Sequence, residues 1–454
     1  MVRIQISFLL LTFLFLPLAG QGIFEQSLSS SKSGNDLIHG FTRGCWYGNF
    51  PSGNTPYTNS IYGQTSIQIS ARSHTRAQTF ADLRLRSAFE YGSVVNQAEL
   101  REAWVNLKTG AGDFRIGKQI LAWGRADGFN PTDNLTPVDY FVRSHDTDEM
   151  RLGNWALTYN LAPVPWLKLE LAYLPVYQPS VYRFDLVGFS ELINFGEMRT
   201  TGYGLKDGTL AAKVGILSGK IEGSISYFRG YDLMPFLAPG ALTMPPEGNF
   251  GLSINPTVFR QEIFGADFSA ALGKTALRGE IAWRNPSNLF EESAFIPESE
   301  WNATLSIDRS FGKLHMVAAW AGKWVENFIP MDPPGTLDPA LLSDPAIWPY
   351  LPGMIDQYLA YANRLLFEQT DEWMHRLILR PSLNLFHETL SLEANIYYNL
   401  TTGEHLIWPS FTWSPADRVK FSAGYQYYQG KENTRIEWIK ELFSGPYIEL
   451  KLFF

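Results

Sequence analysis

The feature that most constrains this chain is the alternation of connection lengths between its amphipathic segments. From residue 41 onward, segments of about 9–15 residues alternate apolar and polar side chains, as a β-strand with two different faces does. In chain order, every second connection is short, in most cases with Gly, Pro or Asp in the turn, and many of the others are long. The expected strands are 41–50, 60–72, 79–91, 97–109, 112–121, 151–161, 166–175, 209–217, 219–230, 258–272, 274–284, 300–311, 313–326, 372–386, 388–400, 404–415, 417–430 and 445–454.

Short turns at one end and long loops at the other indicate a transmembrane β-barrel. A closed sheet leaves no unpaired backbone edge in hydrocarbon, where each unpaired polar group costs several kcal/mol. We therefore expect an all-β fold in which residues 41–454 form a transmembrane antiparallel barrel of about 18 strands, with short periplasmic turns and long extracellular loops. A propeller or a sandwich does not sort its loops in this way.

The two ends of the sequence agree with this fold. Residues 1–22 carry one early charge, Arg3, then an apolar run and small residues, which is the layout of a cleaved signal peptide rather than of a membrane helix. Residues 23–40 are Ser-rich and are expected to form a short periplasmic lead. The alternating stretch 446–454 ends on Phe454 and resembles the closing strand of Gram-negative outer-membrane barrels. That resemblance implies pairing with the first strand, recognition by the barrel-insertion machinery and a place in the outer membrane lipid.

Composition excludes several other classes. The net charge of -8 argues against binding of nucleic acid, and the single Cys45 excludes an internal disulfide and a Cys-based metal site. The mean hydropathy of -0.12 combined with 15% aromatic residues suits a barrel, although a large secreted β protein would give similar values.

Alternation also assigns the faces of each strand. With Leu377 and Leu379 directed to lipid, Arg376 and Arg380 face the lumen, because a lipid-facing Arg near the midplane costs roughly 2–4 kcal/mol. Such a basic lumen attracts carboxylates or phosphates. The alternative is that these arginines pair with acidic neighbours such as Asp82, Glu90, Glu280 and Glu393 and brace the wall. The candidate pore-lining and substrate-binding residues are Arg84, Arg86, Arg115, Arg278, Arg284, Arg376 and Arg380.

The most distinctive segment, residues 115–140, runs from a strand into a loop rich in Gly, Asn, Asp and Pro. It resembles a group of porin-like barrels with a Gly-(Lys/Arg)-Gln…Trp-Gly…Asn-Pro-x-Asp segment, and the chain is distantly similar to alginate-export porins. The resemblance implies a loop that enters and narrows the lumen, although a rigid loop with turn-capping Asp and Asn residues is the alternative. Lys118 requires a bulge at Gly117 to face inward. The candidate constriction residues are Lys118, Trp123, Arg125, Asp127, Asn130, Asp133 and Asp139.

One further loop, 327–371, opens Pro-rich and then predicts a helix over residues 354–368, as a lid, a plug or a surface helix. The seven His residues lack metalloprotease spacing, no Gly-x-Ser-x-Gly elbow occurs, and the loop aspartates lack EF-hand spacing. We expect no enzyme, no cofactor and no metal.

The sequence thus predicts a monomeric outer-membrane pore for small hydrophilic solutes, with anions as candidates. A polysaccharide-export porin, a surface adhesin or structural barrel plugged by its loops, and a barrel hydrolase are the alternatives.

Overall fold

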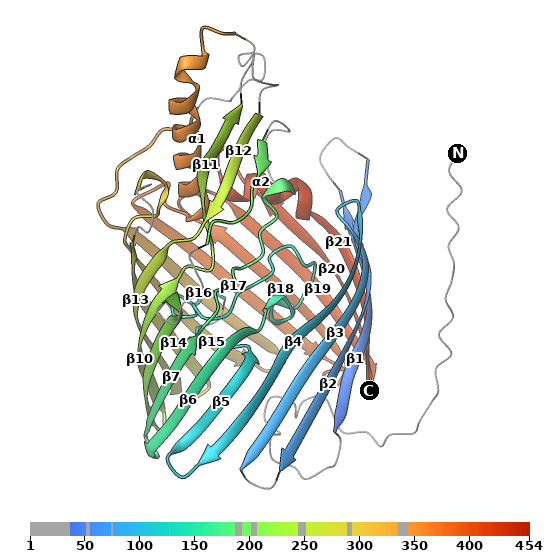
Figure 1. The fold of residues 1–454 in the computed structure, drawn as a ribbon. Coiled ribbons are helices and arrows are strands. Elements are labelled where there is room, and N and C mark those ends of the chain that lie inside the picture. Colours follow the sequence, from blue (N-terminus) through green and yellow to red (C-terminus); the bar gives the residue numbers. More distant parts are fainter. Residues whose placement is uncertain are drawn as a thin grey trace.

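A single closed antiparallel sheet dominates the molecule (Figure 1). The computed structural model describes residues 37–50, 55–73, 76–126, 128–186, 193–200, 207–243, 251–287, 293–334 and 344–454, so the expected signal peptide lies outside the described residues. Within these ranges the sheet has 18 strands, and β1 pairs with β21 to close it, with Cys45 opposite Glu449. The barrel strands are β1 (Ile38–Asn49), β2 (Tyr57–Ser73), β3 (Ala77–Glu90), β4 (Ser93–Thr109), β5 (Gly112–Gln119), β6 (Asn154–Val164), β7 (Leu167–Leu174), β9 (Thr209–Ser218), β10 (Ile221–Tyr231), β13 (Arg260–Leu272), β14 (Thr275–Ser287), β15 (Glu300–Phe311), β16 (Leu314–Val325), β17 (Trp373–Leu385), β18 (Leu390–Asn399), β19 (His405–Ala416), β20 (Val419–Gln429) and β21 (Gly445–Phe453).

Every expected strand is confirmed, with ends that shift by a few residues. The turns also form where expected: Gly273 and Gly312, between paired strands, have φ angles of 66° and 64°, a left-handed conformation that glycine adopts without strain. These hairpins make a short-turn end of the barrel, and the longer connections make a long-loop end (Figure 1).

The side chains sort between the two faces of the wall as the alternation predicts. The outward Leu377, Leu392 and Leu450 are 45%, 40% and 45% exposed, while the inward Arg376, beside Leu377, is 2% exposed. Apolar side chains thus cover the outside, and charged groups lie inside, which is the arrangement that hydrocarbon around the barrel requires.

An outward row of tryptophans crosses four neighbouring strands near the long-loop end. Trp283, Trp301, Trp324 and Trp373 of β14–β17 lie opposite one another in register. The indole N–H groups of Trp283 and Trp301 donate to a carboxylate oxygen of Glu326 at 3.2 and 2.8 Å. Amphipathic indoles at this height are typical of a membrane–water interface.

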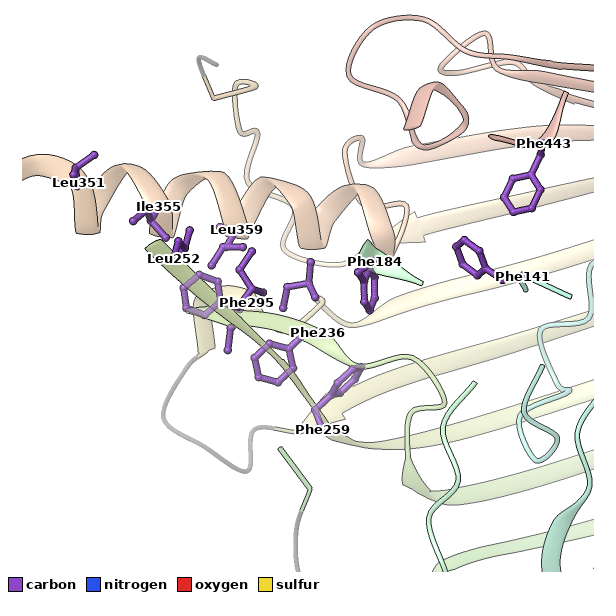
Figure 2. Packing of buried hydrophobic residues seen from close by; sticks show 14 residues of the cluster. Phe141, Phe184, Phe236, Leu252, Phe259, Phe295, Leu351, Ile355, Leu359 and Phe443 are labelled. Atoms are coloured by element: carbon purple, nitrogen blue, oxygen red, sulfur yellow. The ribbon is translucent and has the colours of Figure 1, made fainter. Parts of the chain in front are cut away.

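The long loops fold into a structure of their own above the rim. Phe236 and Leu252 of its small sheet pack with Ile355 and Leu359 of a helix, and Phe141 and Phe443 approach each other with ring centroids 5.6 Å apart (Figure 2). The elements of this loop structure are β8 (Ile193–Phe195), β11 (Phe236–Thr243), β12 (Gly251–Thr257), α1 (Leu351–Leu366) and α2 (Arg435–Phe443), with the short 3₁₀ helices η2 (Thr147–Met150), η3 (Phe184–Leu186), η5 (Ser293–Phe295) and η7 (Trp348–Tyr350).

Helix α1 confirms the helix expected over 354–368 and shows that it packs on the loop sheet rather than in the lumen. One amide fixes it there: Asn363 accepts from the Leu237 N–H at 2.7 Å and donates to the Leu237 carbonyl at 2.8 Å. Asn363 therefore satisfies backbone groups on the free edge of β11. No helix within the described ranges is both long and apolar enough to cross a bilayer.

Candidate functional site

The connection between β5 and β6, residues 120–153 and here called the lumen segment, lies against lumen-facing side chains on opposite sides of the barrel. Its first part, which includes Arg125, Ala126 and Phe129, contacts β10 and β13–β15. Its second part, which includes Arg143, Glu149 and Arg151, contacts β1–β4, β20 and β21. The segment therefore crosses the interior of the barrel, where Figure 1 shows it behind the front strands.

The first part is held by a carboxylate of the wall. Glu280 of β14, 4% exposed, accepts from the backbone N–H groups of Arg125, Ala126 and Thr132, and from the Thr132 hydroxyl at 2.9 Å. The Ala126 bond is 2.7 Å long. A buried carboxylate needs this many donors to offset the loss of water, so the segment and Glu280 depend on each other.

Arg125 makes the second contact of this part. Its guanidinium pairs with Asp267 of β13 at 2.6 Å and with Glu222 of β10. Two strands of the wall thus bind one side chain of the lumen segment, which fixes its position across the barrel.

In the second part the carboxylate belongs to the lumen segment and the cations belong to the wall. Glu149 lies 2.7 Å from the Arg84 guanidinium, 3.2 Å from the Lys451 ammonium and 3.7 Å from Arg43. Burial by itself raises the pKa of Glu149, but these cations and Arg101 outweigh it and hold the pKa at about 2. Glu149 therefore stays ionised and ties the segment to β1, β3 and β21.

The sequence-predicted arginines all occupy lumen-facing positions, and most of them have partners. Arg84 binds Glu149, Arg86 pairs with Glu90 and Arg278 lies 3.4 Å from Asp308. Arg284 donates to Asn134 of the lumen segment at 2.6 Å, Arg376 pairs with Glu368, and Arg115 lies 4.0 Å above the Trp104 ring. These contacts favour the interpretation in which the arginines brace the wall and the segment.

Arg380 differs from the other six because it is exposed. Like Arg115 and Arg284, it has no carboxylate at ion-pairing distance within the described ranges. It lines a pocket together with Asp308, His315 and Glu393. Arg380 is thus the one member of the predicted set, among described residues, whose charge faces open lumen.

Residues 44–443 match the family described as "protein of unknown function (DUF1302)", which is most of the sequence. The chain belongs to the DUF1302 family. No curated protein matches it. Among solved structures, OccK9 (OpdG) of Pseudomonas aeruginosa is similar with a TM-score of 0.52 and 8% identity over 92% of this chain and 97% of that chain. OccK5 (OpdH) of the same organism has a TM-score of 0.50 and 12% identity over 92% and 96%. At these identities the likeness concerns the barrel fold.

The predicted constriction residues of this DUF1302 barrel have different roles. Trp123 is buried, Asp133 accepts from the Trp123 N–H and pairs with Arg151 at 2.8 Å, and Asp139 accepts from two backbone N–H groups as a turn cap. Burial raises the pKa of Asp133 despite Arg151. The Asn130 carbonyl accepts from the Asp133 N–H, and Asp127 lies outside the described residues.

Lys118 is a correction. No bulge occurs at Gly117, and Lys118 pairs in register with Ala103 and with the outward, 47% exposed Trp155. Its position therefore faces outward and not the lumen. Lys118 stands next to the last residue of β5 at the long-loop end, where a flexible ammonium can reach polar surroundings.

Sequence reasoning missed the two carboxylates that hold the segment as anchors. Glu280 appeared only as a possible arginine partner, and Glu149 is one acidic residue in a loop rich in them. A second missed signal is the small side chain at inward positions of β6, β7 and β9. Ala156, Ala172 and Ala211 are buried and leave room for Trp123 against the wall.

Proposed function

We propose that this DUF1302 protein is an outer-membrane channel for small polar solutes, in which the lumen segment narrows the passage. The observation that carries the proposal is the closed 18-stranded wall with apolar side chains outside and charged ones inside. Barrels of 16–18 strands are wide enough to leave an aqueous channel, whereas barrels of about eight are filled by their own side chains.

Water-facing charges in the lumen support the same function. The inward side chains of Lys168 and Glu222 are 49% and 43% exposed, so the lumen next to them is wide enough for water. Since most of the predicted arginines hold partners of their own, the proposal assigns direct contact with solute to Arg380.

The proposal includes the route to the membrane. Residues 1–22 act as the signal peptide, the C-terminal strand β21 is read by the barrel-insertion machinery, and the barrel works as a monomer.

A conductance measurement tests the proposal. Purified protein in a planar bilayer with KCl on both sides is expected to give discrete current steps. A correctly folded barrel, shown by its β-sheet circular dichroism, that passes no current would overturn the channel.

That negative result would support a different function, a surface adhesin or structural barrel plugged by its loops. The packed core of the loop structure, with Phe236, Leu237 and Ile254 fully buried, favours this second candidate. Its test is the same bilayer recording, because a plugged barrel inserts but gives no steps.

A further inference from the structure

The lumen segment contacts one sector of the wall less than the rest. Its hydrogen bonds and ion pairs reach β1–β4, β6, β10, β13–β15, β20 and β21. In the part of the chain that the structure describes, none of them reaches β16–β19. Among the described residues, two contacts do reach this sector: the Arg376 guanidinium lies 5.1 Å from the Phe129 ring, and Gly128 packs against the Ile378 side chain of β17. Along β16–β19 the segment therefore blocks the lumen least, and a solute that passes it meets the side chains of these strands.

A pocket of about 220 Å³ lies in this sector. Its polar lining comes from β15–β18 and consists of Asp308, His315, Arg380, Ser382, Glu393 and Asn395. The volume is below the roughly 300–1,000 Å³ of pockets for drug-sized ligands, so the pocket suits a smaller solute.

The charged side chains of the pocket differ in whether they already have an ion-pair partner in the protein. Asp308 is occupied, because Arg278 lies 3.4 Å and His315 3.3 Å from its oxygens. Arg380 and Glu393 are both exposed, and Glu393 accepts only a 3.3 Å hydrogen bond from the Ser391 hydroxyl among the described residues. One cation and one anion are thus available to a ligand.

These two groups stand on adjacent strands and on the same face. Glu393 is opposite Ser382, and Arg380 is the next inward residue along β17. Diagonal neighbours of this kind lie about 7–8 Å apart, so one small solute can contact both.

We propose that this pocket is a subsite for small zwitterions that carry a carboxylate and an ammonium group, such as free α-amino acids. Arg380 binds the carboxylate and Glu393 binds the ammonium, while Ser382 and Asn395 offer neutral hydrogen-bonding groups. The inference rests on the proposed channel function and names its solute class.

The exposure of both charges suits a passage rather than a storage site. Contacts between exposed charges are weak because water screens them, and a channel must release what it binds. A pure anion meets Glu393 as a repulsive group, and a pure cation meets Arg380 in the same way, so the pair favours solutes with both charges.

The test compares four probes of similar size, alanine, propionate, isopropylamine and isopropanol, in swelling assays of liposomes that contain the protein. The wild type is expected to pass alanine faster than the other three. Arg380→Gln is expected to lower the alanine-to-isopropylamine rate ratio about fivefold, and Glu393→Gln the alanine-to-propionate ratio by a similar factor. Lys168→Gln, which removes a lumen charge on the opposite wall, is the matched control and is expected to keep the wild-type ratios.

The outcomes separate the two proposals. Rate ratios that stay at wild-type values in both pocket variants, with KCl conductance present, would overturn the zwitterion subsite and leave the channel standing. A wild type without KCl conductance would overturn the channel and the subsite with it. Unchanged β-sheet circular dichroism and gel mobility in each variant show that the barrel has folded.

Discussion

The two halves of the lumen use the same residue type in different ways. Arg376 and Arg380 lie on the same face of β17, yet Arg376 is 2% exposed and pairs with Glu368, while Arg380 is exposed and faces the pocket. Toward the long-loop end, charges hold the loops and the lumen segment; toward the short-turn end, some remain free. A basic residue in a pore wall therefore indicates selectivity only where its charge lacks a protein partner.

The largest expected effect comes from removing the lumen segment. Replacement of residues 122–151 by a short Gly-Ser linker should raise single-channel conductance several-fold, because the lumen segment then no longer crosses the interior of the barrel. Planar-bilayer recording measures the effect, and circular dichroism checks the barrel. If the shortened protein conducts like the wild type, the segment does not limit the passage.

The next effect is expected at the wall carboxylate. Glu280→Gln replaces a carboxylate that accepts hydrogen bonds from three N–H groups and one O–H group, and it should lower the free energy of unfolding by about 3–5 kcal/mol, the usual effect of breaking a buried charged contact. Urea unfolding followed by tryptophan fluorescence measures it. Glu388→Gln, an exposed turn residue, should stay within about 0.5 kcal/mol of the wild type; equal effects for both variants would exclude the anchor role of Glu280.

Acid should release the other anchor. Because the pKa of Glu149 is lowered from 4.5 to about 2, its ion pairs stabilise the folded protein fully above pH 4.5 and are lost as pH falls toward 2. The contribution is on the order of 3 kcal/mol. Glu149→Gln should remove this part of the pH dependence, which unfolding midpoints recorded between neutral and acidic pH would show. Parallel curves for variant and wild type would contradict the assignment.

The smallest effect is the one that tests the comparison most directly. Arg380→Gln should shift the reversal potential in a KCl gradient by a few millivolts toward cations and leave the unfolding midpoint unchanged. Arg376→Gln should lower the unfolding midpoint and leave the reversal potential unchanged. A reversal-potential shift in Arg376→Gln equal to that in Arg380→Gln would remove the distinction between the two halves.

The barrel could be predicted because its rules are local. Alternation fixes which side chains meet lipid, and turn residues such as Gly273 and Gly312 fix where strands end, so every barrel strand follows from a short stretch of sequence. The loop structure obeys no such rule. The strands β8, β11 and β12 and the helix α2 pack on residues distant in the chain, and residues 176–208, 231–257 and 431–444 give no periodic pattern that reveals them.

For the candidate site, the sequence predicts which side of the wall a residue faces better than it predicts what that residue binds. Residues such as Arg84 and Arg376 face inward as expected, but their partners, Glu149 and Glu368, belong to loops whose paths the sequence does not determine. For Lys118 the prediction of the face itself is wrong. Its charge suggested an inward side chain, but the register of β5 is regular and gives Lys118 an outward position.

The amide pair between Asn363 and Leu237 has a consequence for the cell surface. In the proposed orientation the small sheet of β8, β11 and β12 projects beyond the bilayer, where neighbouring molecules are crowded. An open strand border there would invite strands from other copies to add on and build fibres. Because Asn363 of helix α1 occupies the N–H and C=O groups of Leu237 on that border, a strand from another molecule cannot pair with β11 at this residue.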